Sequence, residues 1–203
     1  MTNPIKLGIA GLGTVGIGVV KIIQQKAKTL QARTGRKIEL VAVSAKTRQK
    51  ERGVNLSMYD WESDPVSLAN RKDIDIFVEL IGGHSGPAKD SVLAAINSGK
   101  DIVTANKALL AHHGQELAKK KKKNNKSLRF EAAVAGGIPV VKALTEGLAG
   151  NSLTRVVGVI NGTCNYIRTR MQSAGLSYEE VFKEAEALGH LEADPNLDVG
   201  GSD

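Results

Sequence analysis

The sequence has few cysteines, aromatic residues and long apolar runs. A single cysteine, Cys164, excludes a disulfide within the chain and is typical of a reducing compartment. Aromatic residues make up only 3% of the chain, so few side chains could stack on the bases of a single-stranded nucleic acid. No uncharged stretch reaches the roughly 18–20 residues of a membrane span, and no basic leader precedes a cleavable apolar run. We expect a cytoplasmic protein without a membrane or nucleic-acid partner.

The net charge of +7 comes largely from one segment. Lysines at 119–123 and 126 supply six of these charges, which leaves +1 for the rest of the chain. Such a run occurs in nucleic-acid-binding proteins, but lysines also stabilise the negative end of a helix dipole. We favour a solvated helix end. The 203 residues, 41% of them apolar, are enough for one large domain or two modest ones.

Expected strands and helices alternate over the first 130 residues. The expected strands are 5–10, 38–43, 74–80, 101–104 and 128–133, and the expected helices are 17–28, 87–97 and 109–123. This order predicts an α/β fold with a doubly wound parallel sheet. Later expected elements are a helix over 140–148, a β-rich run over 155–160, and a helix that Ser177 caps and Gly189 ends. We therefore expect a nucleotide-binding domain at 1–134 and the beginning of an α+β domain at 135–203.

A glycine-rich turn joins the first expected strand to the first helix. In a dinucleotide-binding GxGxxG turn, Gly11 permits the tight turn, Gly13 lets the backbone approach a pyrophosphate, and Gly16 lets the helix pack on the strand. The helix N-terminus supplies N–H donors for the phosphates. Neighbouring strands end at Gly82, Gly83 and Thr104. The sequence thus predicts a dinucleotide site, with a plain strand-to-helix turn as the alternative.

The end of the second expected strand bears on the choice between NAD and NADP. An NAD site usually has an acidic residue there, which binds the ribose hydroxyls. Here no carboxylate follows Ser44, and Lys46, Arg48 and Lys50 stand in its place. These cations favour a 2′-phosphate, so we expect NADP rather than NAD, with Lys46 and Arg48 beside the phosphate. A solvated basic loop is the alternative.

Six blocks of the sequence resemble homoserine dehydrogenase. They lie at 11–16, 79–83, 104–110, 131–139, 161–166 and 188–195, and the match spans nearly the whole chain. This family reduces L-aspartate 4-semialdehyde to L-homoserine with NAD(P)H, on the route to threonine, methionine and isoleucine. The resemblance implies a Rossmann-type domain followed by part of a substrate and dimerisation domain. It also implies a homodimer for the full-length protein.

The resemblance implies roles for individual residues. The cofactor-binding positions are Gly11, Gly13, Thr14, Val15, Gly16, Lys46, Arg48, Gly83, Thr104, Lys107 and Gly189. Lys107 and Asp198 belong to the catalytic set, with Lys107 orienting or polarising the substrate oxygen. Glu192 and Asp203 contact the amino-acid substrate. Glu131, Val134, Gly136 and Ile138 match a sodium site. From the residues alone, Lys107 could also be a surface lysine, and the acidic residues of 192–203 could form a solvated turn. Residues 131–138 could be a strand that leads into a glycine turn.

Two other functions stay open at this point. A phosphorylating semialdehyde dehydrogenase would use Cys164 as a nucleophile, and a nucleotide-binding module would lack turnover. In the family pattern an acid–base lysine follows shortly after Asp203, where this sequence ends. We therefore expect the 203-residue chain to bind the cofactor but to reduce the aldehyde very poorly. His112 and His113 have no zinc-site spacing, and we assign them to the surface.

Overall fold

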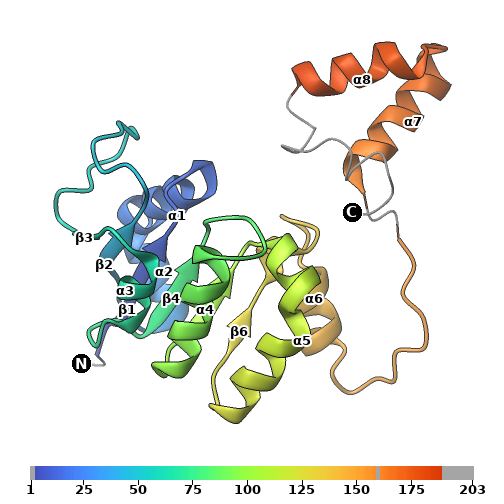
Figure 1. Ribbon diagram of the computed structural model, residues 1–203. Helices are drawn as coiled ribbons and strands as arrows, with labels where there is room; N and C mark the ends of the chain where they lie inside the picture. Colours follow the sequence, from blue (N-terminus) through green and yellow to red (C-terminus); the bar gives the residue numbers. More distant parts are fainter. Residues whose placement is uncertain (1–2, 159–160, 189–203) are drawn as a thin grey trace. The chain divides into compact units, whose positions relative to one another are not determined.

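The computed structural model describes residues 3–158 and 161–188 (Figure 1). The chain divides into two compact units, Met1–Ala149 and Gly150–Asp203. The sheet lies in the first unit, and two helices of the second unit are described separately below. The domain boundary that we expect at 134/135 stays a prediction.

One sheet of six parallel strands forms the centre of the first unit. The strands are β1 (Ile5–Ala10), β2 (Ile38–Ser44), β3 (Asp60–Glu62), β4 (Ile76–Glu79), β5 (Asp101–Thr104) and β6 (Leu128–Arg129). Their order is β3-β2-β1-β4-β5-β6, and each neighbouring pair is parallel. The order reverses between β1 and β4, where a doubly wound sheet has its ligand crevice. The predicted fold class is confirmed.

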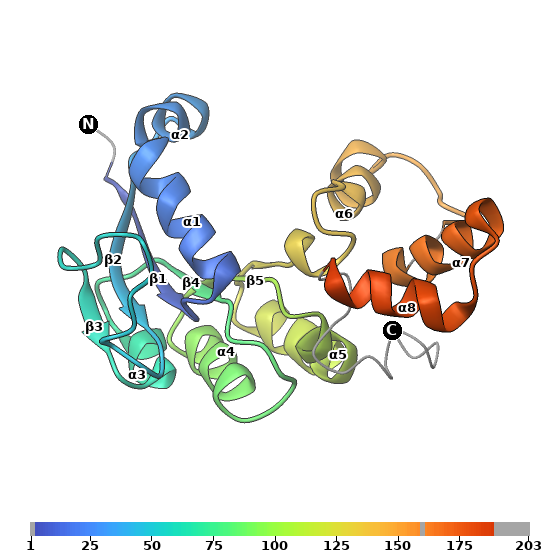
Figure 2. The same ribbon diagram turned by 90° about the horizontal axis from the view of Figure 1, so that it is seen from above.

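Helices cover both faces of this sheet. They are α1 (Thr14–Gln25), α2 (Ala27–Thr34), α3 (Pro65–Asn70), α4 (Pro87–Asn97) and α5 (Lys107–Lys123). Figure 2 shows α1 and α2 on one face, and α3, α4 and α5 on the other. Because both faces are covered, the central strands read as apolar runs rather than as an alternation of apolar and polar residues.

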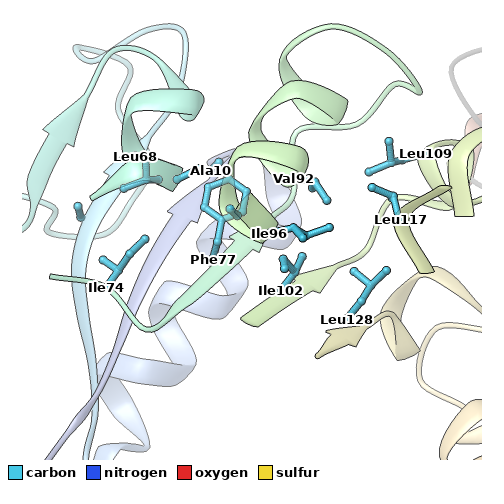
Figure 3. Packing of buried hydrophobic residues seen from close by; sticks show 13 residues of the cluster. Ala10, Leu68, Ile74, Phe77, Val92, Ile96, Ile102, Leu109, Leu117 and Leu128 are labelled. Carbon is cyan, nitrogen blue, oxygen red and sulfur yellow. The ribbon is translucent and has the colours of Figure 1, made fainter. Parts of the chain in front are cut away.

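The larger core cluster lies under α3, α4 and α5 (Figure 3). Phe77 of β4 is fully buried in it, together with Leu68 of α3 and Ile96 of α4. Each such side chain contributes about 1.5–3 kcal/mol through removal from water. A second cluster joins Val20 and Ile23 of α1 to the other face of the strands. These two clusters fix the sheet whose strand ends form the candidate site.

Several expected elements differ from the structure. The first expected helix begins earlier, at Thr14, and divides into α1 and α2. The short elements β3 and α3 were not expected; Asp64 caps α3 by accepting hydrogen bonds from the backbone N–H groups of Val66 and Ser67. The expected strand 74–80 is limited to Ile76–Glu79.

The expected strand 128–133 is wrong in its second half. Only Leu128–Arg129 pairs with β5, and a 3₁₀ turn follows at Glu131–Ala133. The backbone leaves the strand conformation at Phe130, with φ −143° and ψ 26°. The carboxylate of Glu131 then accepts hydrogen bonds from the backbone N–H groups of Val141 (3.1 Å) and Lys142 (2.9 Å). Glu131 thus holds the start of the next helix instead of extending the sheet.

The expected helix 140–148 is less regular than predicted. It consists of α6 (Val140–Lys142) and a π-helical turn, η2 (Ala143–Gly147). The β-rich run also differs, because residues 155–158 form no strand and 159–160 lie outside the described residues. A strand requires a hydrogen-bonded neighbour, and the described part of the chain provides none for this run.

The second unit contains a helical hairpin in its described part. It consists of α7 (Gly162–Ala174) and α8 (Tyr178–Ala187), which pack through Ile167, Val181 and Ala185. The predicted N-cap at Ser177 is confirmed, and Glu180 completes a capping box with it at the start of α8. The predicted stop at Gly189 lies outside the described residues. None of the helices described is long and apolar enough to cross a bilayer.

Candidate nucleotide-binding site

The glycine turn is tightly packed at two of its three fingerprint positions. Gly11 has φ +98°, and a Cβ atom there would overlap the carbonyl oxygen of Leu80. A Cβ atom on Gly16 would overlap the carbonyl oxygen of Gly11. The turn therefore requires glycine at both positions for reasons internal to the fold, which matches the tight turn and the close helix packing expected from the sequence.

Gly13 is in a different environment. It is the N-cap of α1, and a Cβ atom there would meet no protein atom within 4 Å. Thr14 and Val15, the first helical residues, are also exposed. The backbone N–H groups of a first helical turn lack partners within the helix and bind anions readily. The open space at Gly13 thus fits a pyrophosphate against this helix end.

The end of β4 carries a fully buried carboxylate, Glu79. Its Oε1 atom accepts hydrogen bonds from the backbone N–H groups of Ile81 (2.8 Å) and Gly82 (3.3 Å), and from Nδ2 of Asn106 (3.3 Å). Its Oε2 atom accepts a hydrogen bond of 2.5 Å from the hydroxyl of Thr104. Glu79 thus joins the loop after β4 to the end of β5.

Asn106 extends this cluster to the start of α5. Its side-chain amide donates a 2.7 Å hydrogen bond to the carbonyl oxygen of Gly83, and its Oδ1 accepts one of 3.0 Å from the N–H of Leu109. The second bond caps α5, whose first residue is Lys107. The cluster of Glu79, Thr104 and Asn106 therefore brings together three positions expected to bind the cofactor: Gly83, Thr104 and Lys107.

The glycine turn and this cluster are joined through Leu80. The N–H of Leu80 donates to the carbonyl oxygen of Ala10 at 2.7 Å, and its own carbonyl oxygen lies against Gly11. The ends of β1, β4 and β5 are therefore joined by contacts at the point where the strand order reverses. Glu79 and Asn106 belong to sequence blocks that we had noted, but the residues gave no signal for their role.

A third group of residues lies after β2, in the basic loop 44–56. Arg52 organises this loop: its guanidinium donates to the carbonyl oxygens of Thr47 (2.6 Å) and Lys50 (2.7 Å), and also to that of Leu12 in the glycine turn (3.3 Å). The guanidinium also lies over the ring of Trp61. A hollow of about 450 Å³ in this loop is lined by Arg48, Lys50 and Arg52 among others. Lys46 and Arg48 are exposed. Arg52 was missed because its partners are backbone oxygens.

Comparison with known proteins identifies the family. Residues 11–131 match the family of homoserine dehydrogenase NAD-binding domains. Residues 139–203 match the homoserine dehydrogenase family. The chain belongs to the homoserine dehydrogenase family. The resemblance in the sequence is therefore confirmed, and the matching NAD-binding domain supports a nicotinamide dinucleotide as the cofactor class.

Similar proteins cover almost the whole chain. The homoserine dehydrogenase of Neisseria gonorrhoeae is 46% identical over 99% of this chain and 46% of its own length. A crystal structure of a homoserine dehydrogenase from Thiobacillus denitrificans has a TM-score of 0.88 at 41% identity, over 97% of this chain and 45% of the other. A hyperthermophilic archaeal homoserine dehydrogenase in complex with NADPH has a TM-score of 0.81 at 26% identity, over 98% and 65%. The chain spans about half the length of the curated relatives it matches.

The sodium site implied by the resemblance includes one residue with a structural role and three on an exposed loop. Both carboxylate oxygens of Glu131 accept backbone N–H groups, so this side chain already has a structural role. Val134 and Ile138 are exposed on the loop that follows, and Gly136 lies between them. Among the described residues, no group of three or more His, Cys, Asp or Glu side chains could hold a metal ion. One carboxylate and backbone carbonyls still suit a hard cation, and the site stays a prediction.

The structure describes only some of the remaining predicted residues. Gly189, Glu192, Asp198 and Asp203 lie outside the described residues. Cys164 is half-buried in the first turn of α7, where its N–H donates to Oδ1 of Asn161 at 2.8 Å. His112 is exposed, as we expect, but its ring stacks on His84 at 4.2 Å between centroids, and His113 is half-buried.

Proposed function

We propose that this chain is the nucleotide-binding part, and the beginning of the catalytic part, of an NADP-dependent homoserine dehydrogenase. The enzyme reduces L-aspartate 4-semialdehyde to L-homoserine. The observation that carries the proposal is the set of hydrogen bonds at the ends of β1, β4 and β5, through which Glu79 and Asn106 hold Gly83, Thr104 and the start of α5 beside the glycine turn. Family membership supplies the reaction.

The residues divide the work of binding the cofactor. The N–H groups of the first turn of α1, with open space at Gly13, bind the pyrophosphate. Lys46 and Arg48, on the loop that Arg52 organises, bind the adenosine 2′-phosphate. Gly83 and Thr104 border the nicotinamide half. The NADPH complex of the archaeal relative agrees with the choice of NADP.

Lys107 is the residue through which the chain acts on the substrate oxygen. The bound cofactor supplies the hydride. As the carbonyl carbon receives it, negative charge develops on the oxygen, and the Lys107 ammonium stabilises that charge. Asn106 fixes the backbone from which Lys107 extends. Asp198 completes the catalytic set, Glu192 and Asp203 bind the ammonium of the amino acid, and the full-length protein is a homodimer.

Two measurements test this function. NADPH binding to the 203-residue chain should be followed by fluorescence titration, and oxidation of homoserine with NADP should be assayed with the product of the full reading frame that contains the chain. Lys107→Ala should lower kcat by about 10²-fold or more, since one transition-state donor contributes that much. Lys119→Ala, on the exposed part of α5, is the matched control and should leave kcat unchanged.

The alternatives give different results in the same assays. A phosphorylating semialdehyde dehydrogenase would require phosphate and would lose turnover in Cys164→Ala, which homoserine dehydrogenase should tolerate. A nucleotide-binding module would bind NADPH but oxidise no homoserine as the full product. Either outcome would replace the proposed function.

A further inference from the structure

Glu79 is a buried charge that cofactor binding and the Lys107 chemistry leave unexplained. All four of its hydrogen-bond donors are neutral: two backbone N–H groups, the Asn106 amide and the Thr104 hydroxyl. Among the residues that the structure describes, no lysine, arginine or histidine forms an ion pair with it. Three of the four contacts come from N–H groups, which can only donate, so the carboxylate oxygens serve as acceptors there. A carboxylate without an ion-pair partner among the described residues is therefore buried at the end of β4.

The sheet order indicates which half of the cofactor this charge faces. The glycine turn after β1 binds the pyrophosphate, and the end of β2 carries the cations for the adenosine side. The nicotinamide half must then extend in the other direction, over the ends of β4 and β5. Glu79 lies at the end of β4 and is bonded to Thr104 at the end of β5. The carboxylate is therefore on the nicotinamide side of the site.

The nicotinamide ring is positively charged only in its oxidised form. Hydride transfer moves one proton and two electrons from the ring to the carbonyl carbon of the semialdehyde. The ring gains one positive charge, and the substrate oxygen gains a negative charge that a proton then neutralises. A fixed negative charge in a buried setting stabilises the first of these changes, because little solvent screens it.

We propose that Glu79 tunes the redox balance of the site: its buried charge favours the oxidised, cationic cofactor over the reduced one, in addition to holding the Gly83 loop and the start of α5. Bound NADPH is thereby a stronger hydride donor than it would be beside a neutral side chain. Glu79 acts through the field and through Asn106, and is a positioning residue rather than a catalytic one. The inference rests on the proposed use of a nicotinamide cofactor.

The decisive variant is Glu79→Gln, which removes the charge and keeps the shape. The amide oxygen of glutamine can accept the three N–H groups that now bond to Oε1. Its NH₂ can donate to the Thr104 hydroxyl oxygen, which accepts only the N–H of Asn106 among the bonds described. The dissociation constants of NADP and NADPH should both be measured by calorimetry. We expect the ratio Kd(NADP)/Kd(NADPH) to rise about fivefold or more, the size of a typical coupling between two sites.

Two charge-retaining variants separate the field from the geometry. Glu79→Asp shortens the side chain, and Asn106→Ser removes the amide donor while it preserves an N-cap hydroxyl for α5. Both variants should raise the dissociation constants of NADP and NADPH by the same factor, so that Kd(NADP)/Kd(NADPH) keeps its wild-type value. A changed ratio in either variant would mean that loop geometry sets the balance, and it would overturn the proposal even if Glu79→Gln failed to fold.

If Glu79→Gln folds and its ratio Kd(NADP)/Kd(NADPH) equals that of the wild type, the proposal for Glu79 is also overturned. If the wild-type chain bound neither NADP nor NADPH, the proposed function itself would fail instead, so the two failures are distinguishable.

Discussion

Two glycines of α1 should respond in opposite ways to the same added methyl group. Gly16 and Gly18 both lie in α1, where replacing glycine by alanine ordinarily stabilises a helix by about 0.5–1 kcal/mol. A Cβ atom on Gly18 would meet no protein atom within 4 Å, so Gly18→Ala should show this gain. A Cβ atom on Gly16 would overlap the Gly11 carbonyl oxygen and lie 3.0 Å from its carbon.

The overlap at Gly16 involves backbone rather than a flexible side chain. The turn must therefore shift as a unit, and overpacking of this kind costs about 1–3 kcal/mol. We expect Gly16→Ala to lower the free energy of unfolding by about 1–3 kcal/mol, against a gain for Gly18→Ala. Urea unfolding followed by circular dichroism measures both values. Equal stability of the two variants would refute the close packing of the turn.

A substitution at Gly13 tests cofactor binding rather than folding. Its backbone is extended, with φ −79°, and open space surrounds its Cβ position, so Gly13→Val should fold nearly as well as wild type. The same side chain would occupy the space that a pyrophosphate needs, and NADPH binding should be lost in a fluorescence titration. A folded Gly13→Val protein that bound NADPH normally would contradict the whole account of this turn.

Three further outcomes follow from the charged residues. The double variant Lys46→Ala and Arg48→Ala should weaken NADPH binding but not NADH binding in paired titrations; equal effects would contradict the 2′-phosphate site. Arg52→Lys should also weaken NADPH binding, since lysine lacks the fork that reaches the carbonyl oxygens of Thr47 and Lys50 in the loop and of Leu12 in the glycine turn. Arg71→Gln should lower stability by about 1–2 kcal/mol at pH 7. The Arg71 hydrogen bond lowers the pKa of Asp73, so this contribution is fully present above the unfolded-state pKa of about 3.9 and is lost as the pH falls through the lower folded-state pKa. In urea unfolding, the difference between wild type and Arg71→Gln should therefore be smaller at pH 3 than at pH 7.

The alternation of strands and helices could be predicted because each depends on local pattern. The runs at β1, β2 and β5 are apolar and β-branched, and α4 begins with proline as a helix can. Predictions were wrong where a long-range bond decided the structure. Glu131 reads as part of a strand, but its carboxylate binds the backbone ten residues later and ends the sheet at Arg129.

In the candidate site, too, features set by local sequence could be predicted and features set by long-range bonds could not. The GxGxxG turn could be found in the sequence because the close packing of a strand-to-helix turn requires glycines at a fixed spacing. The roles of Glu79 and Arg52 could not be predicted, because the bonds that join their loops to other strand ends reach Thr104, 25 positions away, and Leu12, 40 positions away. A single glutamate at the end of an apolar strand carries no pattern that distinguishes a buried cluster from an exposed strand end.

The pairing register of β1 and β4 determines whether these parts form one site. In the structure Ala10 is paired with Glu79, and Leu80 donates to the carbonyl oxygen of Ala10. A slip of one residue would exchange the faces of the sheet, because side chains alternate along a strand. Glu79 would then leave Thr104 for the α1 face, and Phe77 would leave the core in which it is fully buried. The burial of Phe77 and the bonds of Glu79 therefore select the same register, so the packing of the core also places the carboxylate beside Thr104 at the end of β5.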